Sequence, residues 1–364
     1  MPGIGNILRN GVVGLLLSFS FLDNAREAFA QTPIEQPEIF RGIPSPTYLW
    51  EPVQGDPKAI IIGLHGGVLH GRSYQGLATE LSKKGIMFAS LDLRGYGKWR
   101  YENFGSKRDQ KIRYKDSMKD AESMLVRLHH KYPNTAIICL GESLGSQIAF
   151  KMASKSPDLI DGVVAISPFS NLSGFLSPRM LLNGLQIATH PKGKLDLKPY
   201  LKKKLSENAE EVAFQFADPL NRNKQSIGEI LTTLRMTLSG EKAAFKLPAS
   251  MPVLIVVGDK DTLAGYKGTV KAFKKMTGIN KQLAVLKGSG HLIAEASKPE
   301  PRTINVLNNF VENVSSGRIA LKDSRESITA DRSSAESVDA SAQSLPDGKS
   351  LAAGKLSSNS SLLQ

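Results

Sequence analysis

The 364-residue chain contains a single cysteine, Cys139, so no disulfide can form within it. This fits a reducing compartment, and it equally fits an exported bacterial protein that does without disulfides. Histidine, cysteine and carboxylate side chains nowhere have the spacing of metal ligands, so the sequence implies no metal and no cofactor. No nucleic-acid-binding motif accompanies the net charge of +13, which favours an ordinary basic surface over a nucleic-acid partner.

The apolar run near the N-terminus is too short to cross a membrane. It covers about 12 residues, 11–22, where a membrane-spanning helix needs roughly 20. Arg9 precedes this run and Ala28-Phe29-Ala30 follows it as a small-x-small cleavage site, an arrangement typical of a secretory signal peptide over residues 1–30. We therefore expect an exported protein, periplasmic or secreted. The alternative is an uncleaved N-terminal arm, which would leave the protein cytoplasmic or membrane-associated.

From residue 58 onward, short apolar runs alternate with amphipathic stretches of helical length. Residues 31–57 are punctuated by proline and predict extended or edge-strand structure. The alternation predicts an α/β fold with a mostly parallel central sheet and helices on both faces. We expect strands at Ala59–Leu64, Met87–Leu91, Ala136–Leu140, Gly162–Ile166, Val253–Val257 and Gln282–Leu286. We expect helices at Tyr74–Lys84, Arg113–Lys131, Leu144–Ser154, Thr269–Thr277 and Thr303–Val314.

One connection between predicted strands is far longer than a normal crossover. It covers about 80 residues, 169–250, and therefore predicts an inserted subdomain. The core of the fold is then formed by two segments, 58–168 and 251–314. After residue 314, serine, alanine and aspartate dominate and few apolar residues remain, which predicts a disordered tail over 315–364.

Gly141-Glu142-Ser143-Leu144-Gly145 matches the pattern G-x-S-x-G, which is a weak signal by itself. Here it directly follows an apolar run of strand length and opens a stretch of helical character. A strand-to-helix turn of this kind needs small residues around a strained serine, and the helix N-terminus supplies N–H groups and a positive dipole end. Ser143 is therefore the candidate nucleophile. The alternative is a glycine-rich turn that binds phosphate or nothing.

A serine nucleophile needs a base, and the base needs an orienting carboxylate. Downstream of Ser143 the only histidines are His190 and His291. His190 falls within the insertion, whereas His291 follows a predicted strand, so we expect His291 to be the base. Asp259 and Asp261 both follow another predicted strand, and both are candidates for the acid. All three elements thus lie beyond strand ends, at the sheet edge where open α/β sheets bind ligands.

A fourth element follows the first parallel strand. The run Leu64-His65-Gly66-Gly67 places small residues where a backbone N–H can approach a reacting oxyanion. We assign the two oxyanion donors to the backbone N–H groups of Gly67 and of Leu144, the residue after the nucleophile. The run reads HGGV, so the strict HGGG version of lipases and esterases is absent.

Five sequence blocks occur in an order that resembles one known family. They are LHGGVLHGRSYQGLA, LDLRGYG, LGESLGS, VVGDKDTL and GSGH, within residues 58–312. Together they resemble the monoacylglycerol lipase and lysophospholipase group of α/β hydrolases, also described as serine aminopeptidase-like. Ser146 stands where the family commonly has glycine.

The resemblance implies several roles. It implies that Asp261, not Asp259, is the triad acid, and that the helical insertion is a cap over an acyl pocket. Asp218-Pro219-Leu220 resembles the motif that ends such caps. Asp92 and Arg94 correspond to structural tethers in the family, not to catalytic groups.

The predicted reaction is hydrolysis of a carboxylic ester through an acyl-enzyme on Ser143, with a small-molecule acyl ester or lipid as substrate. Acylglycerols and lysophospholipids are the substrates that the resemblance favours. Two alternatives remain: amide or peptide cleavage by the same triad, and a non-catalytic binding protein that keeps the fold. Six lysines between Lys192 and Lys204 add the hypothesis of transient contact with anionic lipid through the cap; a solvated charged loop is the alternative.

Overall fold

The computed structural model describes residues 32–101, 106–108, 110–169, 193–317 and 327–329, and the statements below concern these residues. No helix among them combines the length and apolar character that crossing a membrane requires. The predicted signal peptide, His190 and the apolar start of the insertion after Phe169 lie outside the described residues.

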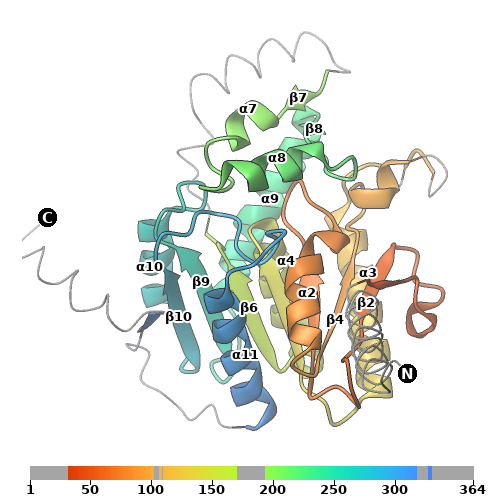
Figure 1. Ribbon diagram of the computed structural model, residues 1–364, viewed down its shortest axis with the longest axis vertical. Helices are drawn as coiled ribbons and strands as arrows, with labels where there is room; N and C mark the ends of the chain where they lie inside the picture. The colour runs from red at the N-terminus through yellow and green to blue at the C-terminus, as the bar shows by residue number, and fades with distance from the viewer. Residues whose placement is uncertain (1–31, 102–105, 109, 170–192, 318–326, 330–364) are drawn as a thin grey trace, which may run out of the picture. The chain divides into compact units, whose positions relative to one another are not determined.

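The described strands form a nine-stranded sheet in the order β1-β2-β4-β3-β5-β6-β9-β10-β11 (Figure 1). All neighbours from β4 to β11 pair in parallel, whereas β2 pairs antiparallel with both β1 and β4. The six central strands are β3 (Ala59–Leu64), β4 (Ile86–Leu91), β5 (Ile137–Glu142), β6 (Gly162–Ile166), β9 (Val253–Gly258) and β10 (Lys281–Leu286). The sequence prediction of a mostly parallel sheet is confirmed.

Helices cover both faces of the sheet, and each of the six central strands contributes to two apolar layers. In β3, Ile60 and Ile62 pack into the layer that includes α3, α4 and α10, while Ala59 and Ile61 pack into the layer that includes α2 and α11. Strands buried on both faces explain why these segments read as continuous apolar runs. The helices are α2 (Gln75–Ser82), α3 (Tyr114–Lys131), α4 (Leu144–Lys155), α10 (Tyr266–Lys275) and α11 (Pro301–Ser315).

The proline-punctuated segment adds the antiparallel strands at one side of the sheet. They are β1 (Ile34–Glu35) and β2 (Thr47–Trp50). All four residues of β2 are buried, and Trp50 makes an edge-to-face contact with Phe88 at 5.8 Å between ring centroids. The segment is therefore part of the core sheet and not merely an extended arm.

The insertion, described from residue 193, lies beyond the carboxyl ends of the parallel strands (Figure 1). It contains β7 (Leu195–Asp196), α7 (Lys198–Leu201), α8 (Ala209–Ala217), β8 (Lys224–Gln225) and α9 (Ile227–Ala244). A capping box begins α9: Ser226 Oγ accepts the Glu229 N–H and the Glu229 carboxylate accepts the Ser226 N–H. Near its end, α9 packs closely on α4, because a Cβ at Gly240 would lie 2.4 Å from the Cβ of Gln147.

All six predicted strands are present with ends within two residues, and all five predicted core helices are present with ends within three. The predicted disordered tail, 315–364, lies almost entirely outside the described residues. The exceptions are Ser315, which ends α11, the turn at 316–317, and β11 (Ser327–Thr329), which pairs in parallel with β10. The tail prediction did not include this strand.

Candidate active site

Ser143 occupies a sharp turn between β5 and α4, with φ 53° and ψ −115°. This left-handed conformation is unusual for a residue with a side chain, and such strain is common at functional sites. The Ser143 N–H donates to the Ile166 carbonyl at 2.8 Å, which fixes the turn to the neighbouring strand β6. The serine is thereby presented at the carboxyl edge of the sheet, as the sequence predicts.

The two glycines of the motif are required by close backbone packing. A Cβ at Gly145 would lie 1.7 Å from the Leu64 carbonyl oxygen, and one at Gly141 would lie 2.1 Å from the carbonyl carbon of Gly145. Ser146 stands where the monoacylglycerol lipase group commonly has glycine. Its buried hydroxyl is accommodated because it lies within hydrogen-bonding distance of two carbonyl oxygens, 2.7 Å from that of Gly141 and 2.9 Å from that of Ile166. The departure therefore leaves the turn intact.

His291 and Asp261 form a buried pair beside this turn. His291 Nδ1 donates to Asp261 Oδ2 at 3.0 Å, while the N–H groups of Leu263 and Ala264 donate to Asp261 Oδ1. Asp259 lies at the surface instead, where its carboxylate accepts the N–H of Gly288. The spacing in the sequence allowed either aspartate to contact the histidine, and in the structure Asp261 makes that contact.

Burial and charge act in opposite directions on this pair. Burial alone would raise the pKa of Asp261, but the facing His291 ring and the backbone donors hold that pKa below its usual range. Burial would lower the pKa of His291, whereas the Asp261 carboxylate, with a smaller contribution from Glu142, raises it above its usual range. Asp261 is therefore ionised at neutral pH and stabilises a protonated His291.

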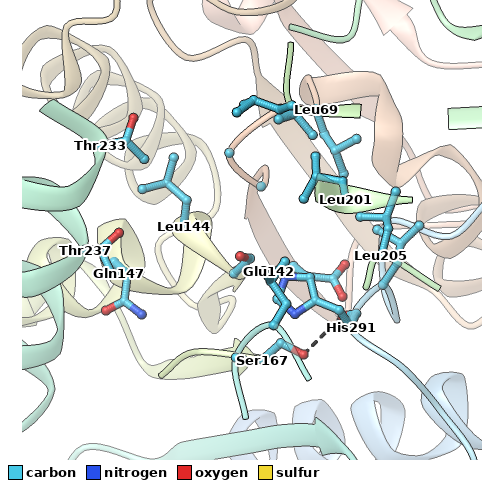
Figure 2. Close-up of a pocket in the computed structure, with 18 of the residues that line it drawn as sticks. Leu69, Glu142, Leu144, Gln147, Ser167, Leu201, Leu205, Thr233, Thr237 and His291 are labelled. Atoms are coloured by element: carbon cyan, nitrogen blue, oxygen red, sulfur yellow. Dashed lines mark hydrogen bonds between the residues drawn. The ribbon is translucent and has the colours of Figure 1, made fainter. Parts of the chain in front are cut away.

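Ser143 and His291 line the same pocket, which encloses about 140 Å³ (Figure 2). In the described part of the chain no hydrogen bond joins their side chains, and such bonds often tighten only when substrate binds. Ser167, directly after β6, donates from its Oγ to the His291 carbonyl at 3.1 Å. This bond holds the loop after β10, which contains His291, against the end of β6. The lining is mostly aliphatic, with Val68, Leu69, Leu144, Leu197, Leu201, Leu205, Ile230, Leu234, Leu263 and Leu292.

The two predicted oxyanion donors, Gly67 and Leu144, also line this pocket. Two hydrogen bonds to the Gly66 carbonyl fix the Gly66–Gly67 peptide. The carbonyl oxygen accepts one from His65 Nδ1 at 2.8 Å and one from the Leu69 N–H at 3.2 Å. Because a trans peptide directs N–H and C=O to opposite sides, these bonds orient the Gly67 N–H. The Gly66 N–H is already used, since it donates to Glu295.

His65 can hold this peptide in only one tautomer. Its Nε2 accepts the Leu93 N–H at 3.0 Å, so Nδ1 carries the proton that goes to the Gly66 carbonyl. Burial lowers the pKa of His65 to about 3, which keeps the ring neutral in ordinary buffers. Sequence reasoning treated His65 only as part of the HGG run and missed this supporting role.

A family model described as serine aminopeptidase, S33, matches residues 55–296. The chain belongs to this family. Among curated relatives, human monoglyceride lipase is 26% identical over 245 residues, which cover 67% of this chain and 78% of that protein. Monoacylglycerol lipase from Mycolicibacterium smegmatis is 25% identical over 261 residues, 70% of this chain and 88% of that protein.

Solved structures show the same architecture. A soluble variant of monoglyceride lipase from Saccharomyces cerevisiae, solved with a substrate analog, aligns with a TM-score of 0.61 at 21% identity, over 78% of this chain and 95% of that one. Monoacylglycerol lipase from Paleococcus ferrophilus aligns with a TM-score of 0.57 at 23% identity, over 75% of this chain and 98% of that one. The fold is therefore the α/β-hydrolase fold that the sequence predicts.

In this member of the S33 family, two buried glutamates join the three loops around the pocket. Glu142, beside Ser143, accepts the N–H groups of Ile293, Ala294 and Glu295 at 2.6, 3.1 and 2.7 Å. Glu295 in turn accepts the Gly66 N–H at 2.8 Å. The serine turn thus holds the segment after His291, and that segment holds the loop after β3, which contains Gly66 and Gly67.

The two carboxyl groups share one buried region and are not both ionised at neutral pH. Burial raises the pKa of Glu295 well above its usual range, and the charge of Glu142 adds to this effect. Burial also raises the pKa of Glu142, to about 7, although His291 and the three N–H donors oppose the rise. Because those donors stabilise a carboxylate, we assign the charge to Glu142 and the proton to Glu295.

The insertion contacts the loop after β3, residues 65–70, directly. His70 Nε2 lies 3.0 Å from Asp218 Oδ2, and Gln225 Nε2 donates to the Gly67 carbonyl at 3.0 Å. Asp218 belongs to the Asp218-Pro219-Leu220 motif noted in the sequence. The insertion therefore helps to fix the loop that carries Gly67, one of the two predicted oxyanion donors, in addition to forming pocket walls.

Asp92 and Arg94 lie outside the pocket lining, as the resemblance implies. Asp92 is fully buried and accepts the N–H groups of Gly71 and Lys98. Arg94 forms an ion pair with Asp120 at 2.6 Å. In the described residues no group of three histidine, cysteine or carboxylate side chains could hold a metal ion.

Proposed function

We propose that the protein is a serine carboxylic-ester hydrolase that acts on acylglycerol-type substrates. The observation that carries this proposal is the buried His291–Asp261 pair beside a strained serine, with His291 and Ser143 both lining one largely aliphatic pocket. An aliphatic pocket of this kind suits an acyl chain, because burying the chain removes apolar surface from water. Relatives named monoglyceride lipase and monoacylglycerol lipase support the substrate class.

The proposed reaction begins with attack of Ser143 Oγ on the ester carbonyl carbon. His291 Nε2 takes the serine proton as the new C–O bond forms, and Asp261 stabilises the resulting imidazolium. The tetrahedral intermediate collapses as the alcohol leaves with that proton, which produces an acyl-enzyme. Water, deprotonated by His291, then attacks the acyl carbon and releases the carboxylic acid and free Ser143.

The negative charge on the carbonyl oxygen is the main charge to be stabilised. In this proposal the N–H groups of Gly67 and Leu144 donate to it, the second at the N-terminus of α4 where the helix dipole is positive. Neither group is engaged by another hydrogen bond among the described residues. The support of the Gly66–Gly67 peptide by His65 makes the first donor available without reorganisation during the reaction.

A fluorophosphonate probe tests the proposed nucleophile. We expect the wild type to be labelled, Ser143→Ala to lose labelling completely, and His291→Ala to lose nearly all of it. Hydrolysis of monoacylglycerols should fall with the labelling, by roughly 10⁴-fold or more in kcat. Labelling of the Ser143→Ala variant at wild-type level, or an unlabelled but folded wild type, would refute the proposal.

Amide hydrolysis is a second candidate, because the matching family is described as serine aminopeptidase. Triad and oxyanion hole serve both reactions equally. An aminopeptidase also needs a free carboxylate for the substrate ammonium, and the two carboxyl groups that line the pocket, Glu142 and Glu295, are both bonded to backbone N–H groups. Comparison of p-nitrophenyl acyl esters of graded chain length with aminoacyl-nitroanilides decides between the two reactions.

We also propose that the insertion acts as a cap that touches anionic lipid. Leu201 and Leu205 are buried and line the pocket, while Lys202 and Lys203 between them are exposed. This sidedness supports a segment that faces the substrate on one side and a lipid surface on the other. A solvated charged loop is the competing interpretation.

Vesicle binding distinguishes these interpretations. We expect the triple variant Lys202/Lys203/Lys204→Gln to bind phosphatidylglycerol vesicles less tightly than the wild type, with the difference abolished by salt. The matched control is Lys271/Lys274/Lys275→Gln, three exposed lysines of α10, which removes the same charge elsewhere. Equal weakening by both triple variants, or by neither, would contradict the proposal.

Export through a cleaved signal peptide over residues 1–30 is a further proposal. It is supported by the apolar run and the Ala28-Phe29-Ala30 site in the sequence. Mass spectrometry of the protein from a periplasmic or culture fraction should find an N-terminus at Gln31. Recovery of the intact N-terminus from the cytoplasmic fraction alone would contradict it.

A further inference from the structure

Helices α4 and α9 contribute three polar side chains to the lining of the pocket: Gln147 from α4, and Thr233 and Thr237 from α9. Figure 2 shows them on the same side of the pocket, apart from Leu201 and Leu205. Ser143 is the N-cap of α4, and Gln147 follows it by four residues in the first turns of that helix. At a rise of 1.5 Å per residue, the two backbone positions lie about 6 Å apart along the helix axis. The polar side of the pocket is therefore within reach of a substrate bound to Ser143.

The amide of Gln147 has an unmet hydrogen-bonding capacity. The side chain is buried, with 1% of its surface exposed, and its Oε1 has no hydrogen-bond partner in the described structure. Buried polar atoms without partners are unfavourable and uncommon in native proteins. An aliphatic residue would fill this position without that penalty, so the amide is suited to a partner that enters the pocket.

The two threonines also present hydroxyl groups to the pocket. Ile230, Thr233, Leu234 and Thr237 recur at the spacing of one helical face, and all four line the pocket. The Thr233 hydroxyl pairs with the Tyr114 hydroxyl at 2.6 Å and retains capacity for a second bond. The Thr237 hydroxyl makes no hydrogen bond within the described residues.

Thr232, on the neighbouring side of the same helix, shows the usual alternative. Its hydroxyl donates to the Gly228 carbonyl four residues earlier, at 2.7 Å, and it does not line the pocket. Helical threonines commonly satisfy their hydroxyl in this way. Thr237 differs in that its hydroxyl remains available at the pocket surface.

We propose that Gln147, Thr233 and Thr237 form a subsite for an alcohol hydroxyl of the substrate, an inference that rests on the proposed ester hydrolase function. A hydroxyl can donate to Gln147 Oε1 and accept from Thr237 Oγ or Gln147 Nε2, so both members of the contact are satisfied. A charged group does not fit, because the three side chains are neutral and would not compensate its desolvation. The hydroxyl can come from a glycerol head group or from a hydroxylated acyl chain.

Two pairs of esters distinguish these sources. The first pair is a monoacylglycerol and the methyl ester of the same fatty acid, which differ in the hydroxyls of the alcohol. The second pair is the methyl ester of a β-hydroxy fatty acid and that of the plain acid. For each pair, kcat/KM of the ester with the extra hydroxyl is divided by kcat/KM of the ester without it. This ratio is measured for the wild type, Gln147→Leu, Thr237→Val and the control Thr232→Val.

We expect Gln147→Leu and Thr237→Val each to lower the ratio of one pair by roughly 2- to 10-fold, the effect of one neutral hydrogen bond. Thr232→Val should keep the wild-type ratios. A fall in the first ratio assigns the subsite to the head group, and a fall in the second assigns it to the acyl chain.

Unchanged ratios in both pairs, with folded and active variants, would mean that water alone occupies the subsite and would overturn the inference. A folded wild type that hydrolyses none of the four esters would instead refute the proposed function. Because Gln147 and Thr237 lie on different helices, misfolding of one variant leaves the other as an independent test.

Discussion

Glutamine substitutions at Glu142 and Glu295 should have opposite consequences, although both residues are buried carboxyls in one network. Glu142 accepts three backbone N–H bonds, so it acts as a carboxylate with no donor of its own. Glu295 accepts a single N–H, from Gly66, and its other oxygen has no partner in the described structure. A protonated Glu295 is therefore already similar to glutamine in its hydrogen bonding.

The expected magnitudes follow from these bonds. In Glu142→Gln only one oxygen remains, so at least one buried N–H of the 293–295 segment loses its acceptor and faces an amide NH2. Each buried unpaired donor group costs about 1–3 kcal/mol, and this N–H and the facing amide NH2 are two such groups, so we expect a loss of about 2–6 kcal/mol in the free energy of unfolding. In Glu295→Gln the carbonyl replaces the accepting oxygen, so we expect no loss of hydrogen bonding; at pH 7 this variant should unfold with a higher free energy than the wild type, because the wild type has to keep Glu295 protonated above its ordinary pKa.

Urea unfolding at pH 7, combined with kcat on a monoacylglycerol, measures both effects. Because Glu142 holds the segment after His291, Glu142→Gln should also lower kcat, while Glu295→Gln should keep it within about threefold. Glu295→Leu is the matched variant that leaves the Gly66 N–H unpaired, and it should lower kcat where glutamine does not. Equal losses for the two glutamine variants, or a silent Glu142→Gln, would refute the assignment of charge and proton.

The pH dependence provides a second readout of the same pair. Burial raises both pKa values above the ordinary 4.5, to about 7 for Glu142. A carboxyl with a raised pKa in the folded state contributes stability that is complete below the unfolded pKa and is lost as pH rises through the folded one. Between about pH 5 and pH 8 the wild type should therefore lose more unfolding free energy than Glu295→Gln, and parallel curves would contradict this.

Three further substitutions test other contacts. His65→Ala removes the donor that orients the Gly67 N–H, and we expect kcat to fall about 10-fold or more with a smaller change in KM, measured by steady-state kinetics. Asp261→Asn should lower kcat by roughly 10⁴-fold. It should also move the acid limb of the kcat/KM profile to lower pH, because the Asp261 carboxylate raises the pKa of His291 in the wild type. Asp259→Asn should change neither kcat nor the acid limb. Gly240→Ala would push α9 away from α4, and we expect about 1–3 kcal/mol lower unfolding free energy in urea; an unchanged midpoint would show that the helices can separate freely.

Much of the fold could be predicted because strands buried on both faces are continuous apolar runs. Ser143 and His291 could be predicted for a related reason, since each follows such a run and parallel strands end at one edge of the sheet. Asp261 could not be separated from Asp259 by spacing, because both follow the same strand. The two aspartates differ in which carboxylate reaches His291, 30 residues after Asp261, and spacing along the chain does not indicate that contact.

The supporting contacts could not be predicted from the sequence. Glu142 is visible as an acidic residue inside the G-x-S-x-G motif, but its partners are backbone N–H groups about 150 residues away. His65 is visible in the HGG run, but the orientation of its two ring nitrogens depends on Leu93 and Gly66 in three dimensions. Backbone donors carry no residue-type signal, so contacts of this kind appear only once the chain is folded.

The lone thiol has a practical consequence for following motion of the insertion. Cys139 is fully buried in β5, and burial raises its pKa to about 12, so alkylating reagents meet almost no thiolate there. A cysteine introduced at an exposed position such as Phe214 would then be the single reactive site in the folded protein. A fluorophore attached at that position would report in real time whether α8 moves when an ester enters the pocket. No native residue elsewhere in the chain would need to be removed.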